Sequence, residues 1–212
     1  MSTYEQKIQL KFKLLSKIYG IMDLIYFSNK KSSPRYGLLN NISNKHQRLL
    51  DVCFGAGHSV ILIAENKPNV AITGIDMSKD MLALARKNMK KENISGIETF
   101  EMDATQMDFG DETFDIVTIS LSLHEMEPDI VQKTLAEIFR VLKKGGVFYI
   151  TEWAVPRNFF KRIFFKCTIP IMEPGTFKDF MKINWNTFLT EHQFTFDRID
   201  RYSYTQFIVA TK

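Results

Sequence analysis

The sequence predicts an α/β fold in which a doubly wound, seven-stranded sheet is mostly parallel and ends in an antiparallel C-terminal strand. Two observations predict it. Short apolar runs alternate with segments of helical periodicity along most of the chain, which is typical of parallel strands covered by helices on both faces. The last two apolar runs are joined only by Ser203-Tyr204, and so short a link permits only an antiparallel pair.

The length of the chain indicates one substantial domain. Its 212 residues suffice for a single core, and the composition, 45% hydrophobic and 25% charged, is that of an ordinary globular protein. We expect a helical cap over residues 1–46 and one domain over residues 47–212, in which residues 153–176 form a lid insertion.

The expected elements follow the periodicity of the apolar residues. Residues 4–27 have helical spacing and indicate one or two N-terminal amphipathic helices. Strands are expected at 48–53, 70–75, 97–102, 114–120, 146–152, 194–202 and 205–210, and helices at about 59–66, 78–90, 131–142 and 177–191. Ser78 is a suitable cap for the second of these helices, and Lys143-Lys144-Gly145-Gly146 reads as a turn before the fifth strand.

Cysteine content, hydropathy and charge argue against several classes of protein. Cys53 and Cys167 lie far apart in the sequence, so neither a disulfide framework nor a metal site is expected. No segment reaches the roughly 18 to 20 apolar residues that span a bilayer, and the N-terminus does not resemble a signal peptide, so we expect a cytoplasmic protein. A formal net charge of +4 is too small to indicate a nucleic-acid partner, and none is expected.

A glycine-bearing turn follows the first predicted strand. Gly55 and Gly57 lack side chains, so the backbone can turn sharply there and approach a ligand, with the first amides of the next helix exposed. A tight strand-to-helix turn without a ligand is the alternative interpretation. The ligand of an open α/β sheet lies at the carboxyl ends of its strands, which is where this turn is expected.

Two acidic residues follow the next two strands. Asp76 lies about 20 residues beyond the glycines, the separation at which an acid meets a ribose diol in nucleotide-binding sheets. Asp103 could accept a hydrogen bond from an adenine amino group, and Met77 could lie on an adenine face. A solvated loop acid, a helix cap and a core methionine are the corresponding structural alternatives.

Five motifs in order resemble those of class I S-adenosylmethionine-dependent methyltransferases, and most closely the type that acts in ubiquinone and menaquinone biosynthesis. They are Asp51-Val52-Cys53-Phe54-Gly55-Ala56-Gly57, Gly74-Ile75-Asp76-Met77-Ser78, Met102-Asp103-Ala104, Phe114-Asp115-Ile116-Val117 and Arg140-Val141-Leu142-Lys143-Lys144-Gly145-Gly146. The resemblance covers residues 49–152 and implies a Rossmann-like fold with S-adenosylmethionine as methyl donor and S-adenosylhomocysteine as product.

The resemblance also implies roles for individual residues. The loop from Asp51 to Gly57 would hold the methionine moiety, Asp76 the ribose, and Asp103 with Ala104 the adenine. Ser120 would line the floor beside the methyl group, and Tyr19 resembles an N-terminal tyrosine that folds over the cofactor. Gly20 replaces the aspartate that usually follows that tyrosine, and Cys53-Phe54 departs from the commoner Gly-Cys pair.

Methyl transfer from a sulfonium needs alignment of the acceptor and exclusion of water but no nucleophilic side chain. If the acceptor must lose a proton, His124 is the best placed general base, because imidazole titrates near neutrality. A histidine packed in a loop is the alternative. Glu152 and Trp153 follow the fifth strand and are expected beside the acceptor.

The N-terminal segment and residues 153–177 are both aromatic and basic, and indicate a small, apolar or aromatic methyl acceptor. Such basic amphipathic segments also suit an anionic membrane surface, so peripheral membrane contact is one interpretation. The alternative is an ordinary lid whose lysine face is exposed to solvent. Two other functions stay open. One is a non-catalytic S-adenosylmethionine-binding module. The other, a nicotinamide-dependent oxidoreductase, is disfavoured because Val60 stands where a dinucleotide fingerprint has its third glycine.

Overall fold

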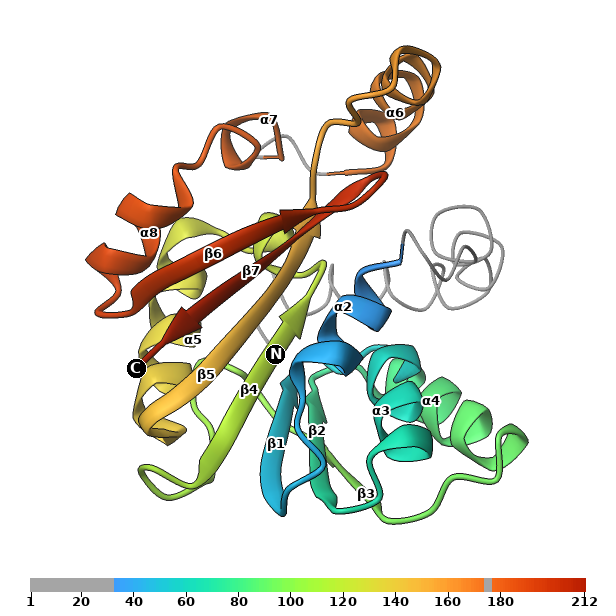
Figure 1. Cartoon of the computed structure of the whole chain (residues 1–212), viewed down its shortest axis with the longest axis vertical. Helices are drawn as coiled ribbons and strands as arrows, with labels where there is room; N and C mark the ends of the chain where they lie inside the picture. The colour runs from blue at the N-terminus through green and yellow to red at the C-terminus, as the bar shows by residue number, and fades with distance from the viewer. Residues whose placement is uncertain (1–32, 174–176) are drawn as a thin grey trace. The chain divides into compact units, whose positions relative to one another are not determined.

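The computed structural model describes residues 33–173 and 177–212, and its compact units are residues 1–104 and 105–212 (Figure 1). The helical segment expected within residues 4–27 lies outside the described residues. We describe each unit by itself.

The described part of the first unit is a three-stranded parallel sheet with its helices. Its elements are α2 (Pro34–Asn41), β1 (Gln47–Val52), α3 (His58–Asn66), β2 (Val70–Asp76), α4 (Lys79–Lys91) and β3 (Ile97–Glu101). β1 and β2 form strands because their apolar runs are buried on both faces, as expected for parallel strands between helices. β2 pairs in parallel with both β1 and β3, so the carboxyl ends of all three strands lie at one edge.

The first turn of α4 confirms the predicted cap. The Ser78 hydroxyl accepts a hydrogen bond from the backbone amide of Met81 at 3.3 Å, which satisfies one donor that the helix cannot satisfy itself. Met81, Leu82 and Ala85 then turn one stripe of the helix into the core, where all three are buried.

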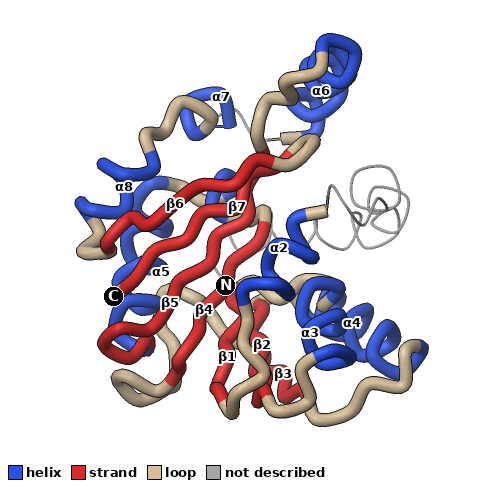
Figure 2. Tube along the Cα trace, viewed as in Figure 1, coloured by secondary structure: helices blue, strands red, loops and turns tan. Residues whose placement is uncertain are grey.

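The second unit is a four-stranded sheet with helices. Its elements are β4 (Phe114–Ser120), η2 (Leu123–Glu125), α5 (Pro128–Val141), β5 (Leu142–Trp153), α6 (Phe159–Met172), α7 (Phe177–Phe180), α8 (Trp185–Glu191), β6 (Thr195–Arg201) and β7 (Thr205–Thr211) (Figure 2). β4 and β5 are parallel, whereas β7 runs antiparallel to both β5 and β6. The strand order is β3-β2-β1 in the first unit and β4-β5-β7-β6 in the second, and the predicted fold class, mostly parallel with antiparallel C-terminal strands, is confirmed.

Two local predictions are wrong. The segment Lys143–Gly146 is a bulge within β5 rather than a turn before it, because the backbone amide of Gly145 donates to Lys212 and that of Lys212 donates to Gly146. The single helix expected at 177–191 is two helices, α7 and α8. Asn184 separates them, since its side chain accepts from the amide of Thr187 and thereby starts α8 anew.

Candidate functional site

The loop after β1 turns through three residues with positive φ. Cys53, Gly55 and Gly57 have φ angles of 57°, 55° and 75°, which is the left-handed region that only glycine adopts without cost. Cys53 therefore holds a strained conformation, as residues at functional sites often do. The side chain of Asn88 in α4 fixes the loop from behind by donating to the backbone oxygen of Ala56 at 3.0 Å.

Phe54 explains why this loop departs from the commoner pattern. Its side chain is buried beneath the loop, and its backbone amide donates to the oxygen of Ile75 at 2.8 Å. A Cβ atom at Gly57 would lie 2.9 Å from the Phe54 ring, and one at Gly74 would overlap it. The two glycines thus leave room for the aromatic ring, which supports the loop from beneath.

Asp76 is oriented by two backbone amides at the end of β2. One carboxylate oxygen accepts from the amide of Gly55 at 2.8 Å and the other from the amide of Ser78 at 2.8 Å. Each oxygen of an ionised carboxylate can accept about two hydrogen bonds, so one position on each oxygen stays open. Burial raises the pKa of Asp76, whereas the hydrogen bonds from Ser78 and Gly55 lower it. This arrangement suits a carboxylate that accepts two hydroxyl groups.

Asp51 is buried in β1, and its Oδ1 atom has no hydrogen-bond partner among the described residues. Burial, with the nearby charge of Asp76, raises its pKa well above 3.8. A buried carboxylate oxygen without a partner is costly, and a cationic ligand group would relieve that cost. Asp51 and Asp76 therefore form an acidic pair that favours a positively charged ligand.

The end of β3 lies beside Asp76. Asp76 and Glu101 are register partners, and the amide of Met102 donates to the backbone oxygen of Asp76 at 3.2 Å. Asp103 and Ala104 follow directly, with Asp103 exposed and Ala104 half-buried. Met77, half-buried, follows β2 at the same edge of the sheet.

The first unit thus assembles every predicted cofactor residue that falls within it: Asp51, Gly55, Gly57, Asp76, Met77, Asp103 and Ala104. These residues fit S-adenosylmethionine. Its ammonium and sulfonium suit the acidic pair of Asp51 and Asp76, and its ribose diol suits the carboxylate of Asp76. Its adenine amino group suits a hydrogen-bond acceptor such as the exposed Asp103. Tyr19 lies outside the described residues, and Ser120 ends β4 in the second unit, half-buried.

In the second unit, His124 is buried between two carboxylates. Its Nδ1 atom lies 2.7 Å from Glu152 Oε2 and its Nε2 atom 3.2 Å from Glu173 Oε2. Glu152 is itself held in place, since its Oε1 atom accepts from the amides of Ser122 and Leu123 at 3.2 and 2.9 Å. His124 follows β4 and Glu152 lies near the end of β5, so neighbouring parallel strands bring the pair together.

The charge of His124 follows from these contacts. Burial by itself lowers the pKa of the imidazole, but the charges and hydrogen bonds of Glu152 and Glu173 outweigh it and raise the pKa to about 10. In the structure, His124 is therefore an imidazolium at neutral pH, and its two ring nitrogens donate to Glu152 and Glu173. An acceptor group that approached Nε2 would have to replace Glu173.

Aromatic rings surround this charged group. Phe177 and Phe180 lie edge-on to the imidazole, with centroids at 5.5 and 6.1 Å. The indole of Trp153 donates to Glu173 Oε1 at 3.2 Å. Reasoning from sequence named His124, Glu152 and Trp153 but missed Glu173, because an acid within the predicted lid insertion gives no signal of its partner.

His124 also belongs to the one group among the described residues whose spacing could hold a cation. Its ligand atom and those of Glu125 and Glu173 all lie within 4.8 Å of one another. The sequence predicts no metal here. A hydrogen bond between His124 Nε2 and Glu173 Oε2 already engages two of the three groups.

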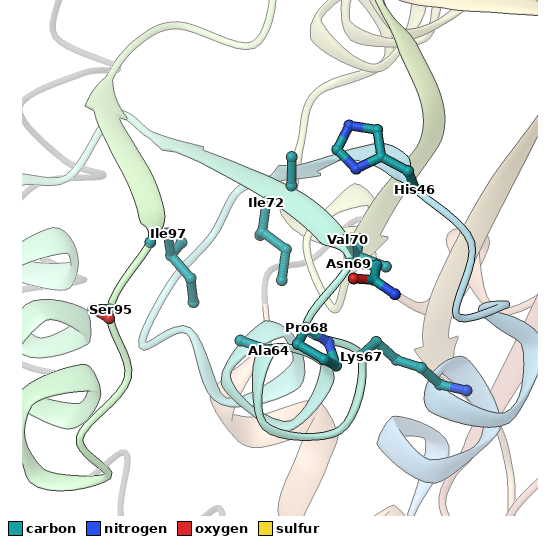
Figure 3. A pocket seen from close by; sticks show the side chains of 11 residues that line it. His46, Ala64, Lys67, Pro68, Asn69, Val70, Ile72, Ser95 and Ile97 are labelled. Carbon is teal, nitrogen blue, oxygen red and sulfur yellow. The ribbon is translucent and has the colours of Figure 1, made fainter.

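A pocket of about 380 Å³ lies at the other end of β2 and β3 (Figure 3). It is lined by Ala64 of α3 and by residues that precede or begin β1, β2 and β3, among them His46, Lys67, Asn69 and Ser95. Asp76 ends β2, whereas Val70, which begins it, lines the pocket, so the pocket is separate from the predicted cofactor residues.

Comparison with known proteins agrees with this geometry. The Methyltransferase domain family matches residues 49–146. A demethylmenaquinone methyltransferase of Bacillus licheniformis is 32% identical over 188 residues, which are 85% of this chain and 79% of the relative. One from Listeria welshimeri is 29% identical over 189 residues, 86% of this chain and 79% of the relative. The crystal structure of a SAM-dependent methyltransferase from Aquifex aeolicus shares the fold, with a TM-score of 0.67 at 19% identity over 92% of this chain and 96% of that one.

Proposed function

The chain belongs to the class I S-adenosylmethionine-dependent methyltransferases, and from that premise we propose that its acceptor is a small, apolar aromatic molecule of the quinol type with an ionisable oxygen. The observation that carries this proposal is the 32% identity, over 85% of this chain, to a relative named demethylmenaquinone methyltransferase. The apolar rings around His124 support it, because they suit an aromatic acceptor better than a charged one.

We assign the donor to the acidic edge of the first unit. S-adenosylmethionine, when bound, supplies a methyl group on a sulfonium, and the electron pair of the broken carbon–sulfur bond stays on sulfur. Asp51, with its unpartnered oxygen, would neutralise the ammonium of the methionine moiety. Asp76 would accept the ribose hydroxyls, and Asp103 with Ala104 would contact the adenine.

We assign the proton of the acceptor to His124 and Glu173 together. Since His124 is an imidazolium at rest and cannot take a proton, we assign that role to the carboxylate of Glu173, whose side chain is 8% exposed. His124 would hold that carboxylate in place through Nε2. Once the carboxylate has taken the proton, Nε2 would donate instead to the acceptor oxygen as it becomes anionic, replacing Glu173. Glu152 would fix the orientation of the imidazole from the opposite nitrogen.

We also propose that the protein is cytoplasmic and meets its acceptor at a membrane surface. Quinol-type molecules with apolar chains partition into bilayers, because transfer of apolar surface out of water is favourable. Among residues 33–173 and 177–212, no helix is long and apolar enough to cross a membrane. The contact proposed is therefore peripheral.

The test is methyl transfer from labelled S-adenosylmethionine to acceptors of different classes. We expect label on a demethylated naphthoquinol with a short side chain and none on tRNA, DNA or a protein mixture. Label on nucleic acid alone would overturn the acceptor assignment. Binding of S-adenosylmethionine without transfer to any acceptor would favour a non-catalytic binding module instead.

The acid–base assignment needs its own variants. Glu173→Gln removes the proton acceptor and should lower turnover by about 10²- to 10⁴-fold, while affinity for S-adenosylmethionine stays unchanged. Glu125→Gln is the matched control, because its carboxylate lies farther from the same nitrogen, at 4.0 Å. Equal turnover of Glu173→Gln and the native protein would contradict the assignment of proton transfer to His124 and Glu173.

A further inference from the structure

Helix α6 exposes an aromatic surface. Phe159, Phe160, Ile163 and Phe164 are 61, 78, 48 and 41% exposed, and among the described residues they are four of the six large hydrophobic side chains that stand out in this way. Single exposed apolar residues are ordinary, but four within six consecutive positions form a continuous patch. We call these four residues the α6 aromatic face.

The periodicity of the helix places these residues together. At about 100° per residue, the four side chains and the exposed Cys167 fall within a sector of about 140°. Phe165 and Ile169 fall on the opposite side, and they are 2 and 0% exposed. The helix therefore has two apolar faces, of which only one is buried by its own unit.

The buried face already attaches the helix to its unit. Phe165 contacts the ring of Trp153 at 6.0 Å and that of Phe177 at 6.5 Å between centroids. Lys161 fixes the first turn, since its ammonium lies 2.9 Å from the hydroxyl of Ser203 in the β6–β7 turn, beside which Figure 2 shows α6. Within the part of the chain that the structure describes, packing thus buries Phe165 and Ile169 and leaves Phe159, Phe160 and Ile163 largely exposed.

Positive charge borders the aromatic face. The exposed cations Arg157, Lys161, Arg162 and Lys166 lie in or just before the helix, and no acidic residue occurs from Trp153 to Met172. Arg162 and Lys166 lie on one border of the apolar sector and Lys161 on the other. Aromatic side chains between cations match an anionic membrane surface, where rings enter the headgroup region and cations meet lipid phosphates.

We propose that the α6 aromatic face docks this protein on an anionic lipid bilayer. This inference rests on the peripheral contact proposed above and names the surface and the lipid chemistry that the contact uses. A second copy of the chain fits this surface less well. Two identical faces packed around a two-fold axis would oppose the cations of one copy to those of the other.

The experiment is co-sedimentation of the full chain with vesicles. Binding is expected to vesicles of equal parts phosphatidylcholine and phosphatidylglycerol, to be much weaker with phosphatidylcholine alone, and to fall as salt is raised. The double variant Arg162→Glu/Lys166→Glu should reduce binding at least about tenfold, since each cation near the surface contributes about a fivefold factor. The double variant Phe160→Ser/Phe164→Ser should reduce binding at least about tenfold as well, because it removes two apolar rings that enter the headgroup region.

Matched controls come from the first unit. Phe100 is 42% exposed on β3, so Phe100→Ser removes an exposed ring elsewhere. Lys87→Glu/Lys90→Glu reverses two exposed charges on α4. Both controls should bind vesicles as the native protein does. Circular dichroism and affinity for S-adenosylmethionine show that each variant is folded.

A tryptophan probe locates the contact. In Phe160→Trp the added indole should shift its emission to the blue and be quenched by brominated lipid, whereas in Phe100→Trp it should respond to neither. Equal loss of binding in controls and α6 variants, or quenching at position 100 and not at 160, would overturn the proposal. So would absence of vesicle binding together with a dimer, seen by ultracentrifugation, that the α6 variants dissociate.

Vesicle binding and methyl transfer are read separately. If the chain binds vesicles through α6 but methylates no quinol, the docking surface stands and the proposed acceptor fails. If it methylates a water-soluble naphthoquinol but ignores vesicles, the acceptor stands and the docking surface fails.

Discussion

The ring of Phe54 occupies the space that a side chain at position 74 would need. An ideal Cβ built on Gly74 overlaps the ring, and one built on Gly57 would lie 2.9 Å from it. Phe54 follows β1 and Gly74 lies in β2, so the pair couples the loop after β1 to the neighbouring strand. Packing beneath the loop, as well as the freedom of its own glycines, therefore sets the shape of the loop.

Gly74→Ala tests this coupling. We expect a loss of about 1 to 3 kcal/mol in the free energy of unfolding in urea, because the added methyl group cannot fit without displacing the ring. In a Phe54→Leu background the same change should cost less, since the smaller side chain leaves room. Gly110→Ala is the control, because its Cβ would meet only Thr113 Oγ1 at an ordinary 3.5 Å. Additive costs in the double variant would contradict the coupling.

Asp76→Ala should weaken binding of S-adenosylmethionine by about 1 to 3 kcal/mol, since it removes the acceptor assigned to the diol and releases the amides of Gly55 and Ser78. Titration calorimetry measures the change. Asp80→Ala, an exposed acid in the first turn of α4, should bind normally. Unchanged affinity in Asp76→Ala would remove Asp76 from the site.

Binding of S-adenosylmethionine should strengthen as pH rises from mildly acidic to neutral. The raised pKa of Asp51 leaves it partly protonated in the free protein, and an ammonium beside it would favour the ionised form. Binding then releases a proton, which calorimetry in buffers of different ionisation enthalpy detects. Asp51→Asn should reduce both the pH dependence and the proton release, and what is left would come from Asp76, whose pKa burial also raises. Equal proton release by this variant and the native protein would rule out Asp51 as its source.

Stability should fall as pH rises above neutrality because of His124. Its pKa is raised from 6.5 to about 10 in the folded chain, so its stabilising contribution is complete below about pH 6.5 and is lost as pH rises through about 10. The urea midpoint, measured from pH 6.5 to 9.5, should decrease for the native protein. This range stays below the ionisation of Tyr149 and Tyr202, whose pKa values burial raises.

His124→Gln should show a lower midpoint at pH 6.5 and little slope over the same range, while Glu125→Gln should keep the slope. The same slope in His124→Gln as in the native protein would mean that another group causes it.

Much of the cofactor side could be predicted from the sequence because its residues follow a local rule. Strand ends and the residues just after them lie at one edge of a parallel sheet, so the order of the elements along the chain is enough to group Gly55, Asp76 and Asp103. The cap at Ser78 and the antiparallel hairpin of β6 and β7 obey equally local rules, of capping and of link length.

Other features depend on contacts between distant residues. The bulge at Gly145 exists because the chain terminus pairs with it, and Glu173 joins His124 although 49 positions separate them. The buried and exposed faces of α6 were likewise undecidable from periodicity, since both are apolar. Only the packing of Phe165 against Trp153 decides which face points inward.

By itself, then, the sequence determined the fold class, since alternating strands and helices leave few other arrangements. The donor followed from the resemblance of five motifs to those of class I methyltransferases, and the residues assigned to it stay a prediction. Tertiary structure alone decided the charge of His124 and the support of the loop by Phe54. The physical reason is that a pKa and a fit between side chains depend on burial and on neighbours in space, which the order of residues along the chain does not specify.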